Sequence, residues 1–230
     1  MIGIIGAMQI EIDGLRAHMK NAEEVELSGI KFLTGEIKGT EVVMAVCGMG
    51  KVYAAICAQT MVIHFKVDAV INTGVAGNLS DKLGIKSVAI ANQVVQHDMD
   101  LTPIGYQYGE LGGLDLVYLP ADEKLVALVE QSVKNMGLNY QIGTIATGDQ
   151  FINKPEQQEF IISHFHAIAA EMEGASIGHV CCINKIPFAI IRTISDDANG
   201  NAPEDFPTFA KEAAEIAIEI VLEVLDNYGK

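Results

Sequence analysis

The sequence predicts an α/β fold, a single-domain three-layer αβα sandwich with a mixed central β-sheet over residues 1–230. Three observations lead to this prediction. The chain has 230 residues, 50% of them hydrophobic, which is enough for one domain with a large buried core. Short apolar runs of strand length alternate with longer segments of helical spacing. Residues 38–40, Lys-Gly-Thr, separate two early strand-like segments at hairpin length, so antiparallel pairs are expected as well.

The first half of the chain begins with a buried strand, since IGIIGA is an apolar run bounded by glycine. Further apolar runs of similar length follow, separated by segments with helical spacing. The expected strands are residues 2–7, 30–37, 41–47, 67–74 and 87–101, and the expected helices are residues 9–20 and 51–64. Residues 102–113 are rich in Gly and Tyr and are expected to form an exposed loop.

The second half alternates more regularly. Helices are expected over residues 121–136 and from residue 155. Another helix should begin where the strand in 166–174 ends and stop before residue 187, and the last should run from after residue 205 to residue 227. Expected strands cover 140–147 and 188–195. Pro155 and Pro207 suit a first helical turn, where a missing N–H group has no helical partner to lose. No repeat or linker interrupts this order, so one domain is expected.

Charge and composition exclude several functions. The formal net charge is −15, which disfavours nucleic acid and anionic membranes as partners. Only Arg16 and Arg192 could form an arginine site for phosphate. No apolar run reaches the roughly 18–20 residues of a membrane span, and the first residues do not resemble a signal peptide. The four cysteines lack C-x-x-C spacing and suit reduced thiols, so a cytoplasmic location is expected.

Common cofactor and metal motifs do not fit. The glycines at 3 and 6 do not form G-x-G-x-x-G, and Val52 after Lys51 breaks the phosphate-loop pattern. No G-x-S-x-G motif indicates a serine hydrolase. His164 and His166 lack a third ligand at a recognisable spacing. Neither a metal nor a cofactor is expected.

Acids and glycine turns follow four predicted strands, at residues 6–11, 72–77, 171–176 and 192–197. In open α/β sheets, ligands bind outside the carboxyl ends of the strands. One acid at such a place commonly caps a helix, whereas four such segments together favour a site. A carboxylate in the buried segment Glu171-Met172-Glu173 needs a polar partner, and a sugar diol or Arg192 could supply it.

These segments carry a family resemblance. The matching pieces occur in order over nearly the full length: IGIIGAMQIEI, GMGKVYAA, INTGVAG, QHDMDLTPIGYQYGE, TGDQFI, AAEMEGASIGHVC and IRTISDDA, followed by FPTF. The chain thus resembles the bacterial 5′-methylthioadenosine/S-adenosylhomocysteine nucleosidases of the nucleoside phosphorylase/hydrolase superfamily. The resemblance implies that adenine is released by hydrolysis of an N-glycosidic bond.

The resemblance also implies a role for each matching residue. Glu11 corresponds to the base that activates water, and Asp196, positioned by Ser195, to the acid that protonates adenine N7. Glu173 corresponds to the residue that binds the ribose hydroxyls. Phe151 corresponds to a residue that stacks on adenine, the backbone of Ile152 to the group that binds the adenine edge, and Met172 to a residue that packs against the sugar. The positions around the ribose and the alkylthio end are Met8, Met49 and Phe206. Arg192 and Glu171 correspond to residues that organise the carboxylates and the water. This division suits glycosidic cleavage, which needs one acid at the leaving group and one base at the water.

The chain departs from the family pattern at three positions. Val75 replaces a serine near the water site, Gly112 replaces a proline, and Ile104 replaces an aromatic residue that reaches the neighbouring subunit's tail pocket. A homodimer is expected, with residues 102–113 presenting Ile104, Tyr106, Tyr108 and Leu111 as an exposed apolar patch that the partner covers.

Three alternatives stay open from the sequence. One is hydrolysis of 6-amino-6-deoxyfutalosine by the same chemistry. Another is a purine nucleoside phosphorylase, which would need cationic side chains for phosphate. The third is a purine-nucleoside sensor without turnover. The sequence does not rank the 5′ substituents of the substrate.

Overall fold

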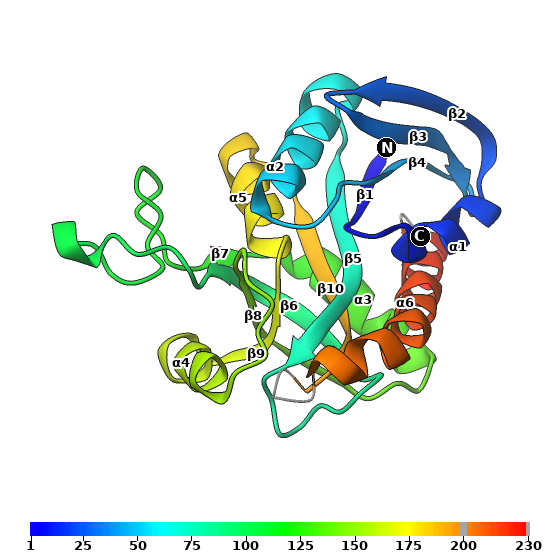
Figure 1. Cartoon of the computed structure of the whole chain (residues 1–230). Coiled ribbons are helices and arrows are strands. Elements are labelled where there is room, and N and C mark those ends of the chain that lie inside the picture. Colours follow the sequence, from blue (N-terminus) through cyan, green and yellow to red (C-terminus); the bar gives the residue numbers. More distant parts are fainter. Residues whose placement is uncertain (198–201, 229–230) are drawn as a thin grey trace.

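All strands that the structure describes belong to one ten-stranded mixed sheet (Figure 1). The structure is a computed structural model and describes residues 1–197 and 202–228. The strands are β1 (Ile2–Gly6), β2 (Lys20–Leu27), β3 (Ile30–Ile37), β4 (Thr40–Val46), β5 (Ala69–Asn78), β6 (Val88–Gln96), β7 (Leu119–Pro120), β8 (Tyr140–Thr147), β9 (Ala167–Glu171) and β10 (Phe188–Asp196). The helices are α1 (Asp13–Ala17), α2 (Lys51–Thr60), α3 (Glu123–Asn135), α4 (Pro155–Phe165), α5 (Gly174–Asn184) and α6 (Ala202–Asn227).

The central strand β5 connects two parts of the sheet. It pairs in parallel with β1 and β10 and in antiparallel with β9. On one side, β1, β4, β3 and β2 extend to an open edge. On the other, β10, β6, β8 and β9 pair in turn and return to β5, so five strands close into a ring. The predicted mixed sheet is confirmed.

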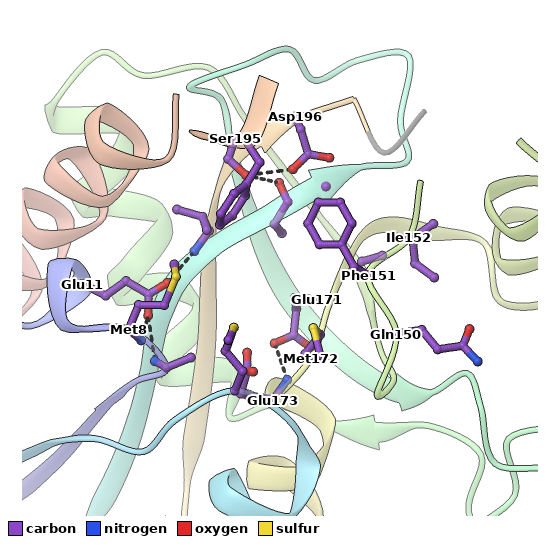
Figure 2. Close-up of a pocket in the computed structure, with 17 residues that line it drawn as sticks. Met8, Glu11, Gln150, Phe151, Ile152, Glu171, Met172, Glu173, Ser195 and Asp196 are labelled. Carbon is purple, nitrogen blue, oxygen red and sulfur yellow. Dashed lines mark hydrogen bonds between the residues drawn. The ribbon is translucent and has the colours of Figure 1, made fainter. Parts of the chain in front are cut away.

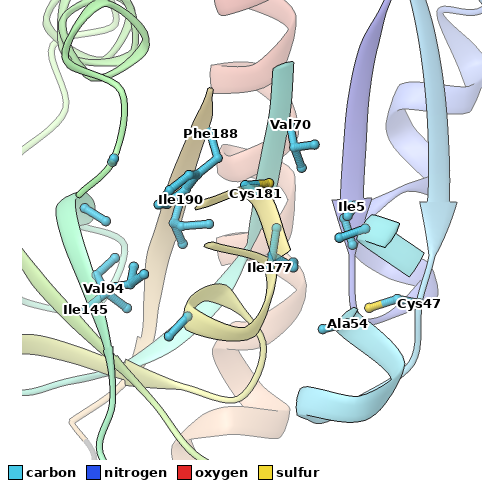
Figure 3. Packing of buried hydrophobic residues seen from close by; sticks show 14 of the residues in the cluster. Ile5, Cys47, Ala54, Val70, Val94, Ile145, Ile177, Cys181, Phe188 and Ile190 are labelled. Carbon is cyan, nitrogen blue, oxygen red and sulfur yellow. The ribbon is translucent and has the colours of Figure 1, made fainter. Parts of the chain in front are cut away.

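Helices cover both faces of the sheet, as the predicted three-layer sandwich requires (Figure 1). Helices α2 and α5 pack together on one face over a buried cluster that includes Ile5, Val70 and Phe188 (Figure 3). Helices α3 and α6 pack on the other face over strand residues such as Ile71 and Ile191. Burial of apolar side chains on both faces explains why the central strands are continuous apolar runs.

Local signals set the ends of several elements. Asp122 caps α3, because its carboxylate accepts hydrogen bonds of 3.0 Å from the N–H groups of Lys124 and Leu125. Helix α2 continues as a π-helix over Met61–Phe65 and ends at Lys66 in the left-handed conformation. Among the described residues, no helix has both the length and the apolar character needed to span a bilayer.

The sequence-based expectations were wrong at four places. Residues 9–20 do not form one helix but a 3₁₀ turn, Gln9–Glu11, and the short α1, after which β2 begins at Lys20. Strand β2 was not expected because its side chains are almost all exposed, so no buried alternation marks it, and β3 holds it through backbone pairing. Helix α6 begins at Ala202, which leaves Pro207 inside the helix rather than in its first turn. The short β7 was also missed.

Candidate active site

A cavity of about 150 Å³ opens where the ends of β1, β5, β9 and β10 meet (Figure 2). It is lined by Ala7, Met8, Glu11, Met49, Val75, Ala76, Gly77, Gln150, Phe151, Ile152, Ala170, Glu171, Met172, Glu173, Ser195, Asp196 and Phe206. All predicted site residues except Arg192 and Ile104 are therefore in its wall. The strand ends bring them together from both ends of the chain, as the sheet rule led us to expect.

Glu11 lies at the end of the 3₁₀ turn after β1 and is buried. Its Oε2 accepts hydrogen bonds from the N–H groups of Ala7 at 2.7 Å and Met8 at 2.9 Å, and its Oε1 accepts one from Val75 at 3.3 Å. Burial raises the pKa of Glu11, while the charge of Arg192 and these backbone donors act in the opposite direction. The result is a fixed carboxylate in the cavity wall with a raised proton affinity.

Asp196 is the last residue of β10 and is buried at the opposite wall from Glu11 (Figure 2). The hydroxyl of Ser195 donates a hydrogen bond of 2.9 Å to Asp196 Oδ2. The pairing of β10 with β5 is irregular between Ile194 and Asp196. Such an irregularity re-aims side chains at a strand end, and here Ser195 and Asp196 both reach the cavity.

Arg192 lies behind the cavity wall, fully buried, and binds the carboxylate of Glu171. Its Nη2 also donates to Asn72 Oδ1 at 2.6 Å. Burial alone would raise the pKa of Glu171, but Arg192, the hydroxyl of Thr147 and the N–H of Gly174 outweigh it and keep that pKa below its usual range. Glu171 and Arg192 thus form a fixed ion pair beneath the site.

Glu173 faces the cavity beside this ion pair. Its Oε1 accepts a hydrogen bond of 2.8 Å from the N–H of Gly50, and its Oε2 lies 3.7 Å from Arg192 Nη2. Burial and the neighbouring charge of Glu171 raise the pKa of Glu173 to about 7, against the attraction of Arg192. One arginine therefore serves two carboxylates, and Glu173 is the less neutralised of them.

The rest of the wall is apolar. Phe151 and Phe206 meet edge to face, with ring centroids 5.8 Å apart and an interplanar angle of 85°. Met8, Met49 and Met172 add thioether side chains to the lining, and Met49 is exposed at the mouth. An aromatic pair offers a flat apolar surface, and methionines adapt to irregular alkyl groups. The cavity thus combines two buried acids at opposite walls with a surface suited to a ring.

Ile104 does not reach this cavity in its own chain. It lies in the 3₁₀ turn Thr102–Ile104 of the loop between β6 and β7, which extends away from the body of the molecule (Figure 1). Its side chain is 72% exposed. The expected patch around it is smaller than predicted, because Leu111 is buried and Tyr108 packs against Phe160 at 5.1 Å. Ile104 and Tyr106 remain exposed.

Sequence reasoning missed the residues that hold the acids in place. Asn72 and Thr147 anchor Arg192 and Glu171, and the N–H of Gly50 holds Glu173. A Cβ on Gly74 would lie 2.6 Å from Glu11 Oε1 and 3.0 Å from Arg192 Nη1, so a larger residue at this position would displace one of these two side chains. All four residues lie in or beside the motifs quoted above, yet nothing in their residue types indicates which acid they hold.

No group of three or more His, Cys, Asp or Glu side chains within residues 1–197 and 202–228 is arranged to hold a metal ion. The cysteines at 47, 57, 181 and 182 are all free thiols.

Known proteins are similar to this chain in both sequence and fold. Residues 1–226 match the model of the phosphorylase superfamily. A Staphylococcus carnosus (strain TM300) protein named 5′-methylthioadenosine/S-adenosylhomocysteine nucleosidase is 41% identical over 228 residues, which cover 99% of this chain and 100% of that protein. The structure of the Neisseria meningitidis nucleosidase of the same name, in complex with methylthio-immucillin-A, matches with a TM-score of 0.95 and 34% identity over 98% of each chain. The native structure of futalosine hydrolase from Helicobacter pylori strain 26695 matches with a TM-score of 0.94 and 34% identity, covering 98% of this chain and 97% of that one.

Proposed function

The chain belongs to the 5′-methylthioadenosine/S-adenosylhomocysteine nucleosidases of the phosphorylase superfamily, and from this membership we propose the reaction that its cavity performs. The protein hydrolyses the N-glycosidic bond of 5′-methylthioadenosine and of S-adenosylhomocysteine. The products are adenine and the corresponding thioribose. We propose further that the protein is a single nucleosidase domain that acts in the cytoplasm in methionine salvage and S-adenosylhomocysteine recycling.

One observation supports this proposal most strongly. Glu11 and Asp196 are buried carboxylates at opposite walls of one cavity, each held by hydrogen bonds from neighbouring groups. Cleavage of a glycosidic bond through an oxocarbenium-like transition state requires one acid and one base on opposite sides of the sugar. The arrangement supplies both.

Glu11 is the base in this mechanism. Its raised pKa makes it a stronger proton acceptor than a surface carboxylate, and three backbone hydrogen bonds hold it still. It takes a proton from water as the water oxygen bonds to C1′ of the ribose. Val75 leaves this region without the hydroxyl that a serine would offer, so Glu11 carries the orientation of the water with less help.

Asp196 is the acid. As the bond between C1′ and N9 breaks, its electron pair passes into the adenine ring, and Asp196 delivers a proton to N7. The hydrogen bond from the hydroxyl of Ser195 fixes the carboxyl group of Asp196 in the direction of the adenine. Proton transfer from a positioned group contributes about 10²–10⁴-fold to the rate, because adenine is otherwise a poor leaving group.

The remaining wall residues bind the two halves of the nucleoside. Glu173 accepts hydrogen bonds from the ribose hydroxyls, since its carboxylate faces the cavity and is only partly neutralised by Arg192. Phe151 stacks on the purine, and the backbone of Ile152 meets its edge. Met172 packs on the sugar, while Met8, Met49 and Phe206 surround the ribose and the alkylthio group. Arg192 and Glu171 organise the carboxylates and the water.

The phosphorylase alternative has little support in the site. A phosphate co-substrate needs cationic donors. Arg16 is exposed on α1, away from the cavity wall, and Arg192 is occupied by Glu171 and Asn72. The residues facing the water position are Met8 and Glu11, and a carboxylate there repels phosphate.

The second candidate substrate is 6-amino-6-deoxyfutalosine. The likeness to futalosine hydrolase from Helicobacter pylori favours it, since that protein has the same fold at a comparable identity. It would use the same acid and base, and only the 5′ substituent differs. A sensor without turnover is disfavoured because both carboxylates required for catalysis are present and buried.

Incubation of the protein with methylthioadenosine, with and without phosphate, tests the function. We expect adenine and methylthioribose at a rate that phosphate does not change. Formation of a ribose-1-phosphate derivative would instead establish a phosphorylase, and absence of adenine at micromolar enzyme would favour the sensor. Comparison of kcat/KM for methylthioadenosine, S-adenosylhomocysteine and aminofutalosine then ranks the substrates.

We also propose that the protein works as a homodimer in which Ile104 of the partner subunit closes the tail pocket. Ile104 is exposed on a loop that projects from the body, and Met49 is exposed at the cavity mouth (Figure 1). Next to Met49, the side chains of Val52, Tyr53 and Ile56 on α2 are exposed as well. Contiguous exposed apolar groups of this kind suit a two-fold interface.

A further inference from the structure

Three segments meet at the outer side of the cavity and are joined by a closed set of polar contacts. The carboxylate of Asp149, in the loop after β8, accepts a hydrogen bond of 2.8 Å from the backbone N–H of Lys51. The backbone N–H of Asp149 donates at 3.0 Å to Asp98 Oδ2, beyond the end of β6. Lys51 Nζ completes the set with a contact of 2.7 Å to Asp98 Oδ1. We call these three residues the latch.

Two of the three joined segments carry part of the site. The turn before α2 contributes Met49 to the cavity wall and the Gly50 N–H that holds Glu173. The loop after β8 contributes Gln150, Phe151 and Ile152. The latch therefore connects the purine wall to the backbone donor of the ribose carboxylate, across segments that are distant in sequence.

The geometry at Gly50 shows how closely the two segments approach. Gly50 has a φ of +97°, in the region that favours glycine, and a Cβ there would lie 2.9 Å from Asp149 Oδ1. Asp98 and Lys51 are only partly exposed, with 17% and 21% of their side chains accessible, so water screens their ion pair less than one at the surface. Although burial raises the pKa of Asp98, the hydrogen bonds from Lys51 and from the Asp149 N–H outweigh it and lower that pKa, which keeps Asp98 ionised.

We propose that Asp149 is a positioning residue: by binding the N–H of Lys51, it fixes the Gly50 donor, and through it the carboxylate of Glu173, relative to Phe151. The nucleoside is then held at its purine and its ribose diol simultaneously. This proposal rests on the function proposed above, because it assigns the diol to Glu173. It adds a residue that lies outside the cavity wall and acts through others.

The consequence can be separated from a general loss of structure. If Asp149 acts through Glu173, its removal should harm only substrates that offer a hydroxyl to Glu173. A general weakening of the fold would harm all substrates alike. The asparagine variant keeps an oxygen that can accept the Lys51 N–H, so it should recover most of the loss seen with alanine.

The test compares Asp149→Ala, Asp149→Asn and the wild type on methylthioadenosine and on its 2′,3′-dideoxy analogue, which offers Glu173 no hydroxyl. A lost hydrogen bond to a charged acceptor at the surface predicts about a fivefold fall in kcat/KM on methylthioadenosine, but less than twofold on the dideoxy analogue, and Asp149→Asn should stay within about twofold of the wild type. Asp81→Asn is the control, since Asp81 is an exposed carboxylate outside the cavity. An equal fall on both substrates would refute the positioning role.

Two further measurements keep the result decisive. If Asp149→Ala does not fold, Asp98→Asn carries the same comparison, because it weakens the contact with Lys51, and an equal fall on both substrates again counts against the proposal. If the wild type releases no adenine, the proposed function fails, and the Kd values of the same two nucleosides, measured by calorimetry, test the latch by themselves. A larger loss of affinity for methylthioadenosine than for the analogue in Asp149→Ala supports the positioning role of Asp149. An equal loss for both nucleosides overturns it.

Discussion

Replacement of Gly74 by alanine should displace Glu11 while every residue of the cavity wall keeps its identity except for one glycine behind it. Gly74 lies in β5 directly behind the carboxylate of Glu11, and its added Cβ would be 2.6 Å from Glu11 Oε1 and 3.0 Å from Arg192 Nη1. Arg192 is fully buried and bound to Glu171, so it has little freedom to move. Glu11 must therefore yield.

The size of the effect follows from the contact distance. Ordinary van der Waals contact begins at 3.4 Å, so relief of the contact at 2.6 Å moves Glu11 Oε1 by about 0.8 Å. That movement breaks or lengthens its 3.3 Å hydrogen bond from Val75. A displacement of about 1 Å at a catalytic group lowers the rate about 10²-fold, and overpacking of this kind costs about 1–3 kcal/mol of stability. We expect both effects together.

Steady-state adenine release and thermal unfolding, measured on the same preparations, check this prediction. Gly84→Ala is the matched control, since a Cβ there meets no atom within 4 Å, and it should keep wild-type rates and Tm. The affinity for adenine alone should be unchanged in Gly74→Ala, because the purine wall lies at Phe151. Turnover within threefold of the wild type would show that the position of Glu11 does not limit the rate.

Three further predictions follow from the site. Asp196→Asn and Glu11→Gln should each abolish measurable adenine release, while the Kd of a bound inhibitor stays within about tenfold of the wild type. The reason is that the lost proton transfers matter mainly in the transition state. Full turnover of either variant would show that the replaced residue is not the acid or the base. Glu173 has a folded pKa of about 7 against an ordinary value of 4.5, so the folded state binds its proton more tightly, and its stabilising contribution is present below pH 4.5 and is lost as pH rises through 7. Denaturant unfolding from pH 4.5 to 8 should therefore show a steeper loss of stability with rising pH in the wild type than in Glu173→Gln, and parallel curves would contradict the assignment. Ile104→Asp should raise KM for methylthioadenosine more than it lowers kcat, with sedimentation reporting the dimer; an unchanged KM, or a fully active monomer, would exclude a role for this loop in the tail pocket.

Much of the fold could be predicted because burial leaves a mark in the sequence. Strands β1, β5 and β10 are apolar runs whose side chains are covered on both faces, and each was expected close to its observed bounds. Strand β2 was missed for the opposite reason. It lies at the sheet edge with exposed side chains, and its backbone pairing with β3 leaves no apolar pattern to detect.

Glu11, Glu173 and Asp196, the residues proposed to carry the chemistry, could be named from the sequence because they lie at strand ends within motifs that match the family in order. The surroundings of these carboxylates could not be read from the sequence: the N–H groups of Gly50 and Val75 donate to Glu173 and Glu11, and Gly74 leaves room for Glu11 because it has no side chain. The contact of Asp149 with Lys51 could not be read from it either. Backbone donors are common to all residues except proline, so their partners cannot be identified from residue type. Their positions depend on how distant segments pack, which the folded chain alone fixes.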